Sequence, residues 1–119
     1  MSPTQRSLAA LRKAGYDAAV CEKWNPHVRI RQDLFGVFDV IAITPVGILA
    51  VQCTSGSNVA SRLTKIGASE SAKRWLRAGG MIEVHGWRKV GAAGKRKKWE
   101  CRVVAIEQHE PEDVNGLPA

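Results

Sequence analysis

Cysteine and histidine are scarce in this chain, with three of each in 119 residues. Cys21, Cys53 and Cys101 lie far apart, form no Cys-x-x-Cys pair, and each interrupts an apolar run. Zinc sites and disulfide frameworks require closely spaced ligands or paired cysteines. We therefore expect three buried free thiols.

Long apolar runs are also missing. No stretch approaches the roughly 20 apolar residues of a membrane span, and the N-terminal residues lack the apolar region of a signal peptide. We expect a soluble, intracellular and cytoplasmic protein without a membrane partner. There are no internal repeats, and the length suits one compact core. The expected organisation is a single domain over residues 1–106, followed by an acidic, flexible tail over residues 107–119.

Acidic residues are fewer than basic ones, 11 against 18, so the chain carries a net charge of +7. Seven Lys and Arg with one Glu fall between residues 85 and 102, whereas residues 107–119 hold four acids and no Lys or Arg. A basic segment of this kind attracts polyanions, and nucleic acid is the usual partner. We expect DNA to bind here.

Apolar periodicity predicts an α/β fold with a central mixed sheet flanked by helices. The two most apolar strands should be central because nearly all their side chains are apolar on both faces. Helices are expected over about residues 2–15, 59–66 and 69–78, and strands over about residues 16–24, 28–31, 37–43, 48–53, 81–90 and 99–106.

Polar side chains interrupt the two central strands at ends that should meet. Asp39 lies near the head of one strand and Gln52-Cys53-Thr54 near the end of the next, joined by a hairpin with Pro45 and Gly47. Because strand side chains alternate, Gln52 and Thr54 should share a face while Cys53 points into the other layer. Asp39 is expected to meet Gln52 and Thr54 on that shared face.

This segment resembles the PD-(D/E)XK nuclease superfamily, in particular its small Holliday-junction-resolvase and VRR-NUC-like members. In that pattern a strand Asp is followed by a hairpin and then by Glu-x-Lys or Gln-x-Lys. Asp39 matches the aspartate, Gln52 the acidic or amide position, and Thr54 stands where the lysine would, giving a degenerate Gln-x-Thr. The resemblance spans roughly residues 8–106, with its specific part in residues 33–57. It implies a restriction-endonuclease-like fold and a homodimer.

The resemblance also implies a metal site that uses Mg²⁺ or Mn²⁺, with Asp39 and Gln52 as ligands. Mg²⁺ prefers hard oxygen ligands, usually one or two carboxylates with waters and a substrate phosphate. Gln52 offers an amide oxygen without charge, so a second carboxylate could come from Asp33 or Glu22. Asp33 is equally explained as a turn residue, and Thr54 as an ordinary strand residue.

Basic residues could contribute to the function in two ways, by replacing the missing lysine and by binding DNA. A cation replacing the missing lysine could come from Lys73 or Arg74 on the following helix, or from Arg31. The candidate catalytic residues are thus Asp39, Gln52, Thr54 and Asp33. The candidate DNA-binding residues are Arg29, Arg31, Lys73, Arg88, Lys89, Lys95, Arg96, Lys97 and Lys98.

Three functions from different classes remain open at the level of sequence. The leading hypothesis is a metal-dependent DNA endonuclease acting on duplex or branched DNA. The alternative is a catalytically impaired relative that binds DNA or a DNA-processing partner, because the lysine and the second acid of the pattern are missing. A protein-interaction module that docks through its acidic tail is the third.

Overall fold

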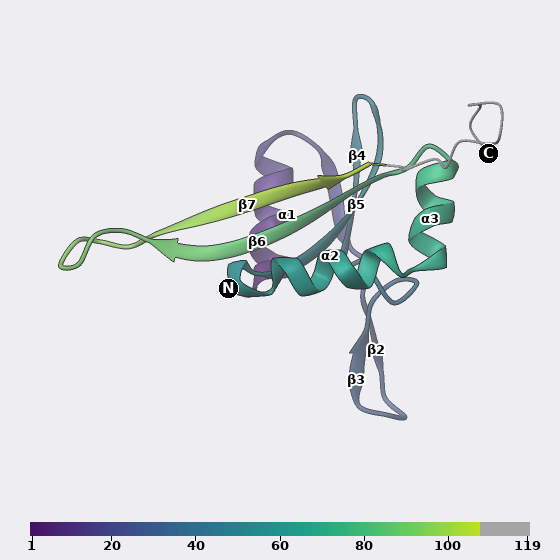
Figure 1. The fold of residues 1–119 in the computed structure, drawn as a ribbon, viewed down its shortest axis with the longest axis horizontal. Coiled ribbons are helices and arrows are strands. Elements are labelled where there is room, and N and C mark those ends of the chain that lie inside the picture. Colours follow the sequence, from purple (N-terminus) through teal and green to yellow (C-terminus); the bar gives the residue numbers. More distant parts are fainter. Residues whose placement is uncertain (108–119) are drawn as a thin grey trace, which may run out of the picture.

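A five-stranded sheet forms the centre of the molecule in a computed structural model, which describes residues 1–107 (Figure 1). The strand order is β1-β4-β5-β6-β7, with β5 and β6 parallel and the other neighbours antiparallel. This confirms the α/β class with a mixed sheet. The acidic tail expected after residue 107 lies outside the described residues. The strands are β1 (Asp17–Val20), β4 (Val40–Thr44), β5 (Gly47–Ser55), β6 (Met81–Val90) and β7 (Lys98–Ile106).

Helices cover both faces of this sheet. They are α1 (Pro3–Lys13), α2 (Val59–Gly67) and α3 (Glu70–Arg77), and a short 3₁₀ turn, η1 (Gly56–Asn58), precedes α2. Ser2 and Ser69 begin α1 and α3 by accepting backbone N–H groups, at 3.2 Å from Gln5 and 3.1 Å from Ala72. Such caps satisfy donors that the first helical turn leaves free. None of the described helices is long and apolar enough to span a membrane.

Strand β5 is the most deeply buried element, with six consecutive buried residues from Leu49 to Thr54. It lies between β4 and β6, and helices cover it on both sides, so alternation no longer separates an inner from an outer face. One core packs against α1 and the other against α2 and α3. The α1 core contains Leu8, Leu11, Val40, Ala42, Leu49, Val51 and Cys53; the opposite core contains Val37, Phe38, Ala50, Val59, Ile66, Ala72, Ile82 and Val84.

The strand expected over residues 16–24 is two strands with different partners. After β1 the chain leaves the main sheet, and β2 (Lys23–Asn25) pairs with β3 (Ile30–Gln32) in a separate two-stranded sheet, the β2–β3 ribbon. The ribbon projects from the body of the molecule (Figure 1). The ladder between β1 and β4 ends at Val20 and Val40, a last backbone hydrogen bond of 2.8 Å joins the Cys21 N–H to the Asp39 carbonyl, and the chain then leaves the main sheet.

The strand expected over residues 37–43 begins later, at Val40. Before it, a tight turn reverses the chain, and Leu34 and Phe38 form an isolated bridge across that turn. Phe35 and Gly36 adopt positive φ angles of 56° and 76°, which the turn requires. Asp39 therefore lies between a turn and a strand and does not belong to the strand itself.

The three cysteines are free thiols, as expected, but the expected burial holds for Cys53 alone, because Cys21 and Cys101 are partly exposed. Burial raises the pKa of the Cys53 thiol to about 12, so this group is protonated at neutral pH. The side chain packs in the α1 core, on the face of β5 opposite to Gln52. This placement confirms the expected alternation along β5.

Candidate metal centre

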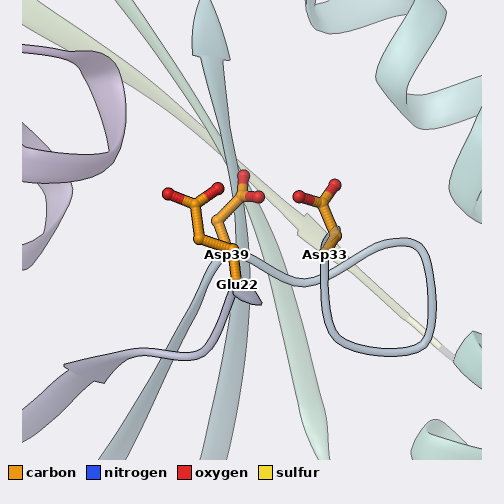
Figure 2. A group of neighbouring side chains, drawn as sticks. All are labelled: Glu22, Asp33 and Asp39. Carbon is orange, nitrogen blue, oxygen red and sulfur yellow. The ribbon is translucent and has the colours of Figure 1, made fainter. Parts of the chain in front are cut away.

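Three carboxylates gather at the base of the β2–β3 ribbon. Glu22, Asp33 and Asp39 each place one ligand oxygen within 4.8 Å of the others. Figure 2 shows the three carboxylates close together and pointing toward the same side. We call these residues the acidic cluster. Such a group could hold a metal ion, because hard divalent cations prefer carboxylate oxygens.

The local fold explains why residues so distant in sequence meet. Glu22 comes directly before β2 and Asp33 directly after β3, and the first cross-strand pair of the ribbon is Lys23 with Gln32. The residues that enter and leave an antiparallel ribbon at its open end must lie side by side. The turn after Asp33 then returns the chain to Asp39, held by a hydrogen bond of 2.9 Å from the Leu34 N–H to the Phe38 carbonyl.

Asp39 is fixed at the inner end of the acidic cluster. Its Oδ2 atom accepts two hydrogen bonds of 2.7 Å, one from the Gln52 side-chain Nε2 and one from the Cys53 backbone N–H. The residue is only 4% exposed. The structure therefore brings Asp39 and Gln52 together, as the sequence predicted. Because both donors bind one oxygen, Oδ1 can still act as a ligand.

Burial also changes the acidity of Asp39. Loss of solvent raises the pKa of its carboxyl from 3.8 to about 7, with further contributions from hydrogen bonding to Asp33 and from the charges of Asp33 and Glu22. The Cys53 N–H acts in the opposite direction but is outweighed. Carboxylates packed this closely repel one another when ionised. The Asp39 carboxyl, with a pKa of about 7, is therefore only partly ionised near neutral pH, and a bound cation would displace its proton.

Gln52 leaves one acceptor without a partner in the part of the chain that the structure describes. Its Oε1 atom is buried and accepts no hydrogen bond, while its Nε2 atom donates to Asp39. A buried acceptor without a donor costs about 1–3 kcal/mol. An amide oxygen is also a hard ligand suited to Mg²⁺. Both the orphaned oxygen and the carboxylates beside it fit a divalent cation.

Two basic side chains form ion pairs with carboxylates of the acidic cluster. The Nζ atom of Lys65 on α2 lies 3.6 Å from Asp33, and Nη1 of Arg31 lies 3.6 Å from Glu22. Arg31 was among the sequence candidates for the missing lysine, but Lys65 was not. The sequence feature that could have identified Lys65 is its position on the first α-helix after β5. Lys73 instead forms an ion pair of 3.2 Å with Glu70 on its own helix α3.

Thr54 lies on β5 two residues beyond Gln52 and is 4% exposed. Its side chain is therefore on the same face as Gln52, as alternation requires, but among buried neighbours. Among the described residues, the hydrogen bonds to Asp39 come from Gln52 and Cys53, and none comes from the Thr54 hydroxyl. A role for Thr54 in the chemistry stays a prediction.

The basic segment forms the outer part of the β6–β7 hairpin, which projects from the body of the molecule (Figure 1). Arg88 pairs with Glu100 across the hairpin at 3.4 Å, and Lys89 lies 5.4 Å from the centre of the Trp99 ring. Arg6 of α1 stacks on the same ring at 3.7 Å and so attaches the hairpin to α1. Of the other five basic residues, Lys95, Arg96, Lys97 and Lys98 lie in or beside the exposed turn, and Arg102 is exposed on β7.

His85 belongs to a separate polar network on the α1 face of the sheet. Its Nδ1 atom lies 2.9 Å from the buried Ser7 hydroxyl, which also accepts a hydrogen bond of 2.9 Å from Trp87 Nε1. Its Nε2 atom lies 2.9 Å from Glu83. This network joins α1 to β6 through the fully buried Ser7 hydroxyl.

No family model, curated protein or solved structure matches this chain. The donor set itself then indicates what the site can hold. Three carboxylates converge, Gln52 is hydrogen-bonded to one of them, and two basic side chains lie at the margin. Oxygen ligands of this kind suit Mg²⁺, Mn²⁺ or Ca²⁺ better than zinc, which in proteins is bound mainly by Cys and His.

Proposed function

We propose that this protein is a metal-dependent DNA endonuclease whose active site is the acidic cluster with Gln52. The observation that carries the proposal is the convergence of Asp39, Asp33 and Glu22, with Gln52 hydrogen-bonded to Asp39. The sequence had supplied Asp39 as the only certain carboxylate. Two further carboxylates in reach supply the negative charge that a Mg²⁺ or Mn²⁺ site needs.

In this proposal the carboxylates and Gln52 bind the metal ion, and Lys65 contacts the phosphate. Asp39, Asp33 and Glu22 would hold the cation, and the Gln52 amide fixes Asp39 through its 2.7 Å hydrogen bond while offering its own oxygen. When bound, the cation lowers the pKa of a water molecule and neutralises charge on the scissile phosphate. Lys65, whose side chain is 40% exposed beside Asp33, can then contact that phosphate and replace the lysine missing at Thr54.

Charge on the rest of the surface supports DNA as the substrate. The net charge is +7, and the exposed end of the β6–β7 hairpin carries Lys95, Arg96, Lys97 and Lys98. Lys and Arg on a projecting hairpin can contact the phosphate backbone independently of base sequence. DNA contacts would thus extend well beyond the phosphate at the cluster. A homodimer, implied by the resemblance, would place two such sites on two strands.

The test is cleavage of linear, nicked and four-way-junction DNA with Mg²⁺ and with Mn²⁺. Asp39→Ala should abolish cutting, because it removes the innermost ligand. Asp17→Ala is the matched control, since Asp17 is an exposed aspartate on β1 outside the cluster. Any metal-dependent cutting that persists in Asp39→Ala, in protein free of contaminating nuclease, would refute the assignment.

A second candidate is a nuclease-like protein that binds DNA without cutting it. The raised pKa of Asp39, about 7, favours this reading because a proton competes with the cation at neutral pH. In that case DNA binding would weaken steeply with salt, and neither Mg²⁺ nor Mn²⁺ would produce cleavage between pH 6 and 9. Gain of cleavage in Gln52→Glu combined with Thr54→Lys would identify the lost residues as the cause.

A further inference from the structure

The β2–β3 ribbon is a small two-stranded sheet with exposed apolar side chains. Its strands are three residues long and every residue of β3 is exposed. A two-stranded ribbon is marginally stable by itself in water, and this one exposes large apolar side chains. Trp24, Val28 and Ile30 are 51%, 57% and 52% exposed. Side chains of this size in a projecting ribbon are typical of contact surfaces.

Charge decides what kind of partner suits the ribbon. Residues 23–32 contain Lys23, His27, Arg29 and Arg31 and no acidic residue. A second copy of the same ribbon would bring like charges together, whereas a polyanion complements them. An aromatic side chain among basic residues is the arrangement that binds nucleic acid by base stacking and phosphate contact.

One face of the ribbon leads to the acidic cluster. Trp24 and Arg31 are directly opposite in the antiparallel pairing and so project from the same face. Glu22, two residues before Trp24, shares that face and forms its 3.6 Å ion pair with Arg31. A DNA strand whose phosphate lies at the acidic cluster would therefore bring its next nucleotides to Trp24 and Arg31.

We infer that Trp24 stacks on an unpaired base beside the phosphate held at the acidic cluster, while Arg31 contacts the adjoining backbone. This inference rests on the proposed function and names its substrate class: DNA with a single-stranded stretch, as at a fork or flap. The interior of an intact duplex offers no base face, because its bases are stacked on one another. Trp24 then discriminates opened DNA from closed duplex.

Binding measured without divalent metal tests this separately from cleavage. Fluorescence anisotropy in EDTA would follow a labelled forked DNA and a labelled single strand, with a covalently closed duplex circle as competitor. Trp24→Ala should weaken binding of the fork and the single strand about tenfold or more, the usual effect of losing one stacking aromatic. Binding of the closed circle should change less than twofold, and Trp24→Phe should retain most of the affinity.

Val28→Ala is the matched control, because Val28 is equally exposed and apolar in the same ribbon but cannot stack. Equal losses in Trp24→Ala and Val28→Ala, or an equal loss for the closed circle, would overturn the stacking role. A change in molecular mass by light scattering in Trp24→Ala, with DNA binding intact, would identify a second copy as the partner instead. If the wild type does not cleave DNA with Mg²⁺ or Mn²⁺ but its DNA binding still depends on Trp24, the proposed function is contradicted and the stacking role is not.

Discussion

Neutralising Asp39 should stabilise this protein at alkaline pH, although the residue is almost fully buried and hydrogen-bonded. In Asp39→Asn the new side-chain oxygen can still accept the bonds from Gln52 Nε2 and the Cys53 N–H. Its NH₂ group can donate to Asp33, where the carboxylate could only do so when protonated. The substitution therefore retains the contacts and removes one charge from the acidic cluster.

The size of the effect follows from the pKa of Asp39, which folding raises from 3.8 to about 7. A group with a raised folded pKa stabilises the native state fully below the unfolded pKa, and this stabilisation is lost as pH rises through the folded pKa. At 1.36 kcal/mol per pH unit, the loss between pH 4 and pH 8 is about 4 kcal/mol. Asp39→Asn should show little of this loss.

Urea unfolding at pH 5, 6, 7 and 8 measures this directly, with tryptophan fluorescence as the signal. The unfolding free energy of Asp39→Asn minus that of the wild type should increase over this range, and Asp17→Asn should show no such increase. Adding Mg²⁺ should stabilise the wild type at pH 8 and leave Asp39→Asn unchanged, because ligand binding to the native state adds stability. A difference that is constant from pH 5 to pH 8 would refute the raised pKa.

Three further substitutions test other parts of the structure. Gln52→Glu adds a carboxylate to the acidic cluster and should tighten Mg²⁺ binding, measured by calorimetry at pH 8; weaker binding would exclude Gln52 from the ligand set. Lys65→Ala should reduce cleavage at least ~10-fold, as loss of a transition-state contact does, with a change in stability of less than about 1 kcal/mol because its ion pair is exposed. Lys13→Ala, at the exposed C-terminal end of α1, is its control and should cut normally. Ser7→Ala leaves His85 and Trp87 without their partner and should cost about 2–4 kcal/mol of unfolding free energy, without affecting Mg²⁺ binding; an unchanged urea midpoint would contradict that network.

The main sheet and its helices could be predicted from the sequence because their signals are local. An apolar run after the Pro45–Gly47 turn located β5, alternating apolar residues located β6 and β7, and Ser2 and Ser69 marked two helix starts. The register of the β4–β5 hairpin also followed from sequence, since a short turn fixes which residues face each other. This placed Asp39 opposite Gln52, and the hydrogen bond between them confirms it.

The acidic cluster, by contrast, depends on where the chain leaves the main sheet. Residues 16–24 read as one strand, and nothing in their pattern marks the transfer from β1 to the β2–β3 ribbon. That transfer places Glu22 directly before the ribbon and Asp33 directly after it. The turn through Phe35 and Gly36 then brings Asp39 close to both.

The sequence by itself thus determined the fold class, the Asp39–Gln52 pair and the positive charge. Only the tertiary structure decided which carboxylates join Asp39 and that Lys65 approaches them from α2. The physical reason is that strand alternation and helix periodicity act over a few residues. Contacts between a ribbon, a turn and a helix depend instead on how complete elements pack.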